Sequence, residues 1–324
     1  IRFGSFELFS SQNDIENLKL LADYTISNYY PEIQSEGKEK HIEFFKNIAE
    51  KTREMIVHWQ RVGFVHGVMN TDNMSIHEIT IDYGPYDWLE YYNPNWTPNT
   101  TDAEGKRYRF GNQANIALWN LYQLANALYP LIEEAEPLEM ILNNFAKKYD
   151  EDFSEMMLKK LGITSKNEEI DKLIQQLLYN LEQTETDYTI FFRNLNLINK
   201  EDSVEDCVTK INFSFYKPEE VTGIILETWH FWFAQYLTIL KEENNSDLER
   251  KTILNSVNPK YVLRNYMAQT AIELAEKEDY SLIDELYSLL LNPYDEQPGF
   301  EKWFNKRPDW ARQKIGSSML SCSS

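Results

Sequence analysis

Apolar residues recur every three or four positions along most of this chain, which is the spacing of an amphipathic α-helix. A first helix is predicted over residues 15–26, where Asn13 and Asp14 precede the apolar stripe and are typical capping residues. A second is predicted over residues 38–59 and ends at Gly63, because glycine accepts the left-handed backbone that closes many helices. The same periodicity predicts further helices over residues 113–134, 138–161, 167–185, 221–241, 259–276 and 280–291.

The pattern changes between residues 62 and 81, where short apolar runs alternate with turn-forming residues. Ser75–His77 and Ile79–Ile81 are predicted to form two small strands. Residues 85–112 are rich in Tyr, Trp, Asn, Pro and Thr and have no periodic pattern. A connection of this length is longer than most loops that only join two elements, so we expect it to have a function. Together these patterns predict a mainly α protein with a small β-hairpin region.

The composition is that of a globular protein, with 42% hydrophobic and 14% aromatic residues among 324. The formal net charge of −20 argues against binding to nucleic acid or to an anionic membrane, because both need a basic surface. The sequence has no apolar run of membrane-spanning length. Cys207 and Cys322 are too few for a disulfide framework, which indicates a reducing compartment.

One segment has the polar pattern of an ATP-using enzyme. Residues 66–73 read His-Gly-Val-Met-Asn-Thr-Asp-Asn, which spaces His66 and Asn73 as protein kinases space the His and Asn of their catalytic loop. An apolar run then leads to Asp82–Gly84, at the place of the kinase Asp-Phe-Gly turn. In kinases the loop Asn and the turn Asp hold magnesium on the ATP phosphates. One amide oxygen and one carboxylate, with phosphate oxygens and water, provide the oxygen ligands that Mg²⁺ prefers.

The segment departs from the kinase pattern at the residue that usually accepts the substrate proton. Val68 stands there and cannot take a proton, whereas Asp72 lies directly before Asn73. The loop therefore keeps its metal-binding residues and has lost or moved its base, so phosphate transfer to a hydroxyl is not the first expectation. The other interpretation is a tight hairpin in a helical protein, in which Asp72, Asn73 and Asp82–Gly84 only form turns.

The order of these motifs resembles the selenoprotein O (SelO) family of kinase-like proteins. Further segments resemble it too, so the resemblance covers essentially the whole chain: Ile1–Glu7, Tyr108–Gln113, Asn258–Tyr266 and Arg307–Ser324. It implies a protein-kinase-like fold in which residues 1–324 form the C-lobe and a helical C-terminal extension. It also implies a protein adenylyltransferase, which transfers AMP from ATP to Ser, Thr or Tyr hydroxyls of proteins with the help of Mg²⁺ or Mn²⁺.

Carried over by motif position, the resemblance implies roles for four residues. Asp72 is the proton acceptor, Asn73 and Asp82 are metal ligands, and Arg2 and Asp82 contact the nucleotide. An arginine suits the last role because its guanidinium donates two parallel hydrogen bonds to phosphate oxygens. The implied partners are ATP and protein substrates, without nucleic acid or membrane. The implied location is the cytoplasm of a bacterium, or the mitochondrion of a eukaryote.

Two features separate this chain from the family pattern. The family's nucleotide-binding N-lobe would lie before residue 1, so this chain alone is expected to bind ATP weakly and to be inactive. Residues 307–324 resemble a basic, Ser-rich redox tail with Cys322, but the long loop has no cysteine to pair with it. The alternative function is an inactive pseudokinase that binds partners or responds to redox conditions. A third reading is an ordinary helical protein with a fortuitous motif.

Overall fold

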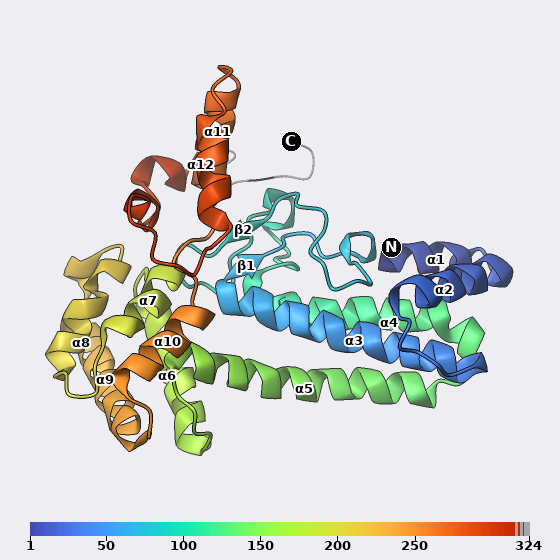
Figure 1. The fold of residues 1–324 in the computed structure, drawn as a ribbon, viewed down its shortest axis with the longest axis horizontal. Coiled ribbons are helices and arrows are strands. Elements are labelled where there is room, and N and C mark those ends of the chain that lie inside the picture. The colour runs from blue at the N-terminus through green and yellow to red at the C-terminus, as the bar shows by residue number, and fades with distance from the viewer. Residues whose placement is uncertain (315–316, 318–319, 321–324) are drawn as a thin grey trace.

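The chain folds mainly into α-helices, as the apolar periodicity predicts (Figure 1). It is seen in a computed structural model that describes residues 1–314, 317 and 320. The helices of this part are α1 (Phe3–Ser11), α2 (Ile15–Tyr29), α3 (Gly37–Val62), α4 (Gln113–Ile132), α5 (Glu136–Leu161), α6 (Glu168–Gln183), α7 (Tyr188–Asn194), α8 (Val204–Ile211), α9 (Gly223–Glu242), α10 (Asp247–Val257), α11 (Asn265–Ala275) and α12 (Ser281–Leu290). Two short strands pair antiparallel in a small sheet, β1 (Phe64–Val65) and β2 (Asp87–Trp88).

The ends of the first long helices follow the capping chemistry of their sequences. The Asp14 carboxylate accepts a hydrogen bond from the Asn17 backbone N–H at the start of α2. Gly63 closes α3 in the left-handed conformation, with φ of 73°, as the sequence predicts. The chain therefore turns directly from α3 into β1, which leads to His66.

Three hydrophobic clusters hold the described helices together. The first lies mainly among α1 to α4 and the first half of α5, and the second mainly among α6 to α10 and the end of α5. α5 joins these two clusters, because Leu142 belongs to the first and Met157 to the second. α3, α4 and α5 lie lengthwise side by side in Figure 1. α11 and α12 form the third cluster, a hairpin that stands away from the other helices (Figure 1).

The β structure lies in a different place from the one predicted. Ser75–His77 and Ile79–Ile81 do not form strands, because the chain turns tightly at Glu78, whose φ is 59°. A single bridge, between Met74 and Thr80, joins the chain on the two sides of this turn, and Ser75 is bridged to Arg2 instead. The two-stranded sheet forms instead on either side of them, in β1 and β2, where aromatic side chains pack across the strands.

One predicted helix also begins later than expected. The periodicity predicts a helix over residues 259–276, but α11 begins only at Asn265. The preceding residues are not helical: the backbone N–H groups of Lys260 and Tyr261 donate to the Pro293 carbonyl, and the buried side chains of Lys260 and Arg264 bind carboxylates of other elements. An apolar periodicity cannot reveal such contacts, since they join residues far apart in the sequence.

Of the two cysteines, Cys207 lies in the part of the chain that the structure describes. Cys322, in the predicted redox tail at residues 307–324, lies outside the described residues. Cys207 is fully buried on α8, where burial raises the pKa of its thiol to about 12. A buried thiol with a raised pKa is unreactive, so Cys207 is a packing residue. Within the described ranges, every helix is too short or too polar to span a membrane.

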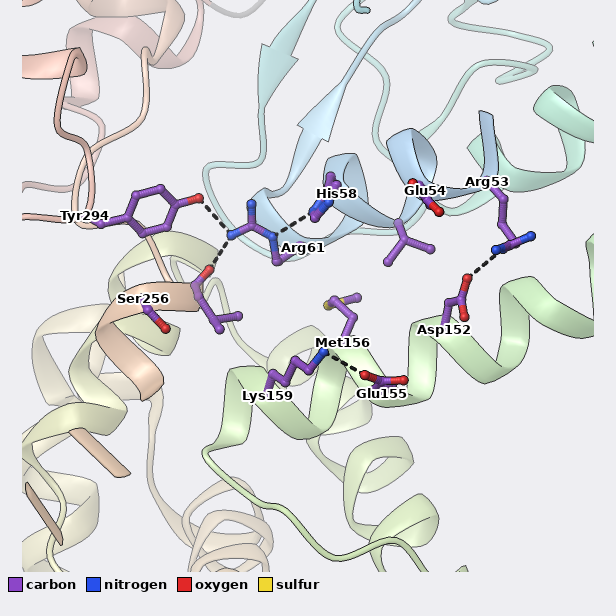
Figure 2. A pocket seen from close by; sticks show the side chains of 12 residues that line it. Arg53, Glu54, His58, Arg61, Asp152, Glu155, Met156, Lys159, Ser256 and Tyr294 are labelled. Carbon is purple, nitrogen blue, oxygen red and sulfur yellow. Dashed lines mark hydrogen bonds and ion pairs between the residues drawn. The ribbon is translucent and has the colours of Figure 1, made fainter. Parts of the chain in front are cut away.

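Three helices end together beside a cleft of about 630 Å³ (Figure 2). Arg61, near the end of α3, donates hydrogen bonds to the Val257 carbonyl at the end of α10 and to the Tyr294 hydroxyl. The Asn258 side chain donates to the Lys160 carbonyl near the end of α5. Carbonyls at the C-terminal end of a helix carry partial negative charge and lack a partner within the helix. These polar and cationic side chains therefore act as helix caps.

Lys160 is the most buried cation at this junction. Its side chain is fully buried, its Nζ donates to the Arg61 carbonyl at 2.6 Å, and it lies 3.8 Å from the centre of the Phe192 ring. Burial, helped by the charge of Arg61, holds the pKa of Lys160 well below its usual value. Among the described residues, the charge that acts on Lys160 is that of Arg61, and no carboxylate offsets it. The folded state therefore binds a proton at Lys160 less tightly than the unfolded state does.

Lys160→Met should remove a pH dependence of stability. Between the lowered pKa and about 10.4, the unfolded chain binds more protons than the folded one, so the free energy of unfolding rises with pH by up to about 1.4 kcal/mol per unit. The gain in stability of Lys160→Met over the wild type should therefore shrink as pH rises from 7 to 10. Urea unfolding at several pH values measures it. Lys159→Met, at the exposed neighbour that pairs with Glu155, is the matched control and should keep the pH dependence that the wild type owes to Lys160. Parallel curves for Lys160→Met and the wild type would contradict the assignment.

Candidate active site

The segment between β1 and β2 is built around two turns. β1 leads directly into His66, a 3₁₀-helix at Thr71–Asn73 forms the first turn, and Asp82 lies in the second. The bridge between Met74 and Thr80 brings the two turns next to each other. Residues that lie about ten positions apart in the sequence are thus held close together.

The beginning of the chain completes this group. Arg2 forms a bridge with Ser75, and the Phe3 N–H donates to the Met74 carbonyl at 3.0 Å. From this position the Arg2 side chain reaches the second turn, where its Nη2 lies 2.9 Å from Asp82 Oδ2. The Arg2 side chain is 48% exposed and that of Asp82 34%, so both remain accessible to a ligand from solvent.

Asp82 has an unusual backbone. Its φ is 55°, in the left-handed region that Asp adopts more readily than most residues but still at a cost. The Gly84 N–H donates to the Asp82 carbonyl at 2.7 Å and closes the turn. Because strained backbone persists only where its surroundings enforce it, this turn is held in one geometry by its neighbours.

His66 supplies one of the contacts that enforce this geometry. Its ring is buried, and its Nε2 lies 2.8 Å from the Ile81 carbonyl, directly before Asp82. The Val68 N–H approaches Nδ1 at 3.4 Å, so the neutral ring with its proton on Nε2 satisfies both contacts. Burial lowers the pKa of His66, which favours this neutral form. The histidine of the predicted catalytic loop therefore positions the second turn and is not a base.

Asp72 and Asn73 lie on the first turn with different surroundings. The Asn73 Nδ2 donates to the Val68 carbonyl at 2.9 Å, which fixes the side chain and leaves Oδ1 as the atom available to a cation. Asp72 is exposed to solvent. Its Oδ1 lies close to Gly4, where a Cβ atom would overlap it. The structure therefore brings Arg2, Asp72, Asn73 and Asp82 together at one place, while their chemical roles remain predictions.

Gly4→Ala should displace the Asp72 carboxylate, because the added methyl group would occupy its place. If Asp72 accepts the proton in catalysis, we expect the transfer rate of the full-length protein to fall about tenfold or more, since small displacements of a reacting group are costly. Ser5→Ala, one residue further along α1, is the matched control and should leave the rate unchanged. The same rate for Gly4→Ala and the wild type would show that the position of Asp72 is not critical.

Three buried polar side chains, which the sequence did not reveal as functional, bind the backbone of residues 64–69, just before the first turn. Gln113 is fully buried, accepts from the His66 N–H at 3.0 Å and donates to the Phe64 carbonyl at 2.9 Å. Asn120 donates to the Met69 carbonyl at 2.9 Å, and Asn99 donates to the Gly67 carbonyl at 3.1 Å. A signal was present, because Gln113 and Asn120 are seven residues apart and so interrupt the apolar face of α4.

The donor atoms in this group suit a hard cation. Asn73 offers an amide oxygen and Asp82 a carboxylate on the adjacent turn, and Mg²⁺ and Mn²⁺ prefer such oxygens. The described residues contain no group of three or more His, Cys, Asp or Glu side chains that could hold a metal by themselves. Phosphate oxygens and water would therefore complete the coordination, as is usual for Mg²⁺ bound with a nucleotide. The cleft in Figure 2 contains none of these residues.

A comparison with protein families finds a match, which extends over most of the chain. Residues 1–291 match the model of the family described as "Protein adenylyltransferase SelO". The match covers well over half of the chain and includes both turns, so the chain belongs to the SelO family.

Curated relatives match along the whole chain. A protein of Flavobacterium johnsoniae named "Protein nucleotidyltransferase YdiU" is 62% identical over 324 residues, which is 100% of this chain and 62% of that protein. Proteins of the same name from Aromatoleum aromaticum and Rhodopirellula baltica are 48% and 46% identical, again over 100% of this chain and over 61% and 63% of their own length. The chain thus spans about three fifths of the length of these relatives.

Proposed function

We propose that this chain carries the catalytic residues of a protein adenylyltransferase, which transfers AMP from ATP to Ser, Thr or Tyr hydroxyls of other proteins. The observation that carries the proposal is the grouping of Arg2, Asp72, Asn73 and Asp82 on three adjacent segments. Membership of the SelO family supports it, and so does the name nucleotidyltransferase given to the relatives. We further propose a protein-kinase-like arrangement and a cytoplasmic location.

In the proposed reaction an acceptor hydroxyl attacks the α-phosphorus of ATP. A new oxygen–phosphorus bond forms, the bond between the α-phosphorus and the oxygen leading to the β-phosphate breaks, and pyrophosphate leaves. Asp72 takes the hydroxyl proton, because Val68 at the usual base position has no group that accepts one. Arg2 pairs with phosphate oxygens when nucleotide is present, in place of its pairing with Asp82.

The proposed cofactor is Mg²⁺ or Mn²⁺, held by Asn73 Oδ1 and the Asp82 carboxylate. Bound there, the ion would neutralise phosphate charge and orient the nucleotide. The chain's contribution is to fix these two ligands, through the Asn73 bond to Val68 and the His66 bond to Ile81.

A second candidate function is a catalytically inactive protein that binds partners or responds to redox conditions. It is favoured by one observation, the replacement of the usual base by Val68. It predicts partner binding that survives Asp72→Ala and Asp82→Ala, with no nucleotide turnover in either the wild type or the variants.

The proposal is tested by incubating the full-length protein and candidate protein substrates with Mg²⁺ or Mn²⁺ and ATP labelled at either the α- or the γ-phosphate. Adenylyl transfer places the α-label on protein and releases the γ-label with pyrophosphate. The α-label should disappear in Asp82→Ala. Label from the γ-phosphate alone would favour a true kinase, and no label from either position would favour the inactive protein.

A further inference from the structure

Residues 258–265 of this chain read Asn-Pro-Lys-Tyr-Val-Leu-Arg-Asn and form a buried connection between α10 and α11. Four of these residues have polar or charged side chains that are almost fully buried: Asn258, Lys260, Arg264 and Asn265. Burying such groups is costly unless each is paired, and here each hydrogen-bonds to another element. This segment, called the polar connection below, has no part in the chemistry proposed so far.

Arg264 joins two elements of the central region. Its guanidinium donates to both carboxylate oxygens of Asp187 at 2.9 Å each, and also to Glu90. Asp187 begins α7, where it accepts from the Ile190 N–H at 2.9 Å, and Glu90 follows β2. The Glu90 carbonyl in turn accepts from the Tyr188 N–H at 3.0 Å. Only a planar, forked donor satisfies two carboxylates in this way, so lysine cannot replace Arg264 fully.

Asn265 binds the chain at residues 86 and 87, shortly before Glu90. Its side chain donates to the Tyr86 carbonyl at 2.8 Å, and its backbone N–H donates to Asp87 Oδ1 at 3.2 Å. Asp87 Oδ1 also accepts from the Trp88 N–H at 2.8 Å. Arg264 and Asn265 together therefore fix residues 86–90, which begin four positions after Asp82.

The stretch from Asp82 to Glu90 is thus held at both ends. At its start, His66 bonds to the Ile81 carbonyl, and Gly67 lies so close to the Pro85 carbonyl that a Cβ atom there would overlap it. At its end the polar connection holds it. Between these anchors lies the left-handed turn at Asp82. A strained turn keeps its geometry only when both flanks are fixed.

We propose that Arg264 and Asn265 are positioning residues, which hold the Asp82 turn in the geometry needed for metal binding and transfer although they belong to the C-terminal helical hairpin. The proposal rests on the function proposed above. It makes Arg264 and Asn265, but not Lys260, part of the active-site scaffold, and it gives α11 and α12 a route of mechanical contact with the site. The competing view is that these residues only stabilise the fold.

The test compares Arg264→Lys and Asn265→Ala with Lys260→Met in the full-length protein. Lys260 is the matched control, since it is also a buried cation of the polar connection, but its ion pairs are with Glu296 and Glu301, which follow α12, and not with residues 86–90. Three quantities are measured: Mn²⁺ affinity by electron paramagnetic resonance, amide hydrogen exchange in residues 79–90, and kcat and KM for AMP transfer. Asn265→Ala removes only one side-chain hydrogen bond and is the milder change. It therefore tests the proposal even if Arg264→Lys does not fold.

Arg264→Lys and Asn265→Ala should weaken Mn²⁺ binding about tenfold, as loss of residues that support metal ligands usually does, and should speed amide exchange in residues 79–90. We expect kcat to fall about tenfold or more, with a smaller change in KM. Lys260→Met should change Mn²⁺ affinity and kcat by less than about twofold. This should hold even if its melting temperature falls as much as that of Arg264→Lys or Asn265→Ala. Equal effects of all three variants, or none, would overturn the positioning role. If the wild type transfers no AMP, the proposed function fails, and Mn²⁺ affinity and exchange still decide this inference.

Discussion

Asp82→Ala should lower the rate of AMP transfer about a thousandfold or more. Asp82 is the proposed carboxylate ligand of the metal and also the partner of Arg2 at 2.9 Å, so its loss removes metal charge from the site and frees Arg2. Groups that stabilise developing charge in an active site commonly contribute this much. Transfer of α-label to a protein substrate measures the rate, and Mn²⁺ titration measures the loss of the metal site.

Asp82→Asn tests the role of the Asp82 charge more specifically than Asp82→Ala does. Asn accepts the left-handed backbone with φ of 55° as well as Asp does, whereas Ala does not, so the turn is preserved while the charge is lost. Tyr83→Phe is the matched control, because Tyr83 is exposed and the substitution keeps its ring contacts with Phe64 and Tyr86. Mn²⁺ binding and transfer that persist in Asp82→Asn would place the metal elsewhere.

Asp72→Asn should lower kcat by roughly a hundredfold to ten-thousandfold, the usual contribution of a general base. Asn73 and Asp82 remain in place, so Mn²⁺ affinity and KM for ATP should change little. Asn has the same shape as Asp and fits beside Gly4, which keeps the first turn intact. Steady-state kinetics at saturating ATP separate the effect on kcat from any effect on binding.

One control variant and two alternative outcomes decide how the Asp72→Asn result is interpreted. Asp102→Asn changes a carboxylate that is also in this half of the chain but is held by the N–H groups of Arg107 and Tyr108, and it should leave kcat within about twofold. An Asp72→Asn protein as active as the wild type would show that another group or water takes the proton. A fall in Mn²⁺ affinity instead of kcat would make Asp72 a metal ligand.

Apolar periodicity predicted the long helices because each buries one face and exposes the other. α3 and α5 are examples, with polar residues on their outer sides. α7 could not be found in this way, because every one of its residues, Tyr188–Asn194, is buried and no periodic pattern remains. The strands at 75–77 and 79–81 were predicted from short apolar runs between turn-forming residues, but around the left-handed turn at Glu78 only the bridge between Met74 and Thr80 forms.

The candidate site was predictable to the extent that it is local in sequence. Asp72, Asn73 and Asp82 fall within two short motifs, and the resemblance to the family added Arg2. The residues that hold the motifs in place come from much farther away: Gln113, Asn120 and Asn265. Their roles depend on hydrogen bonds between distant segments, which residue spacing alone does not specify.

Adenylyl transfer by this group of residues is tested most directly by mass spectrometry of a protein substrate after incubation with the full-length protein, ATP and Mg²⁺ or Mn²⁺. The predicted result is a gain of one AMP unit on a Ser, Thr or Tyr residue, absent with Asp82→Asn. A gain of one phosphate unit, or an unchanged mass under conditions in which the protein binds ATP and metal, would contradict it.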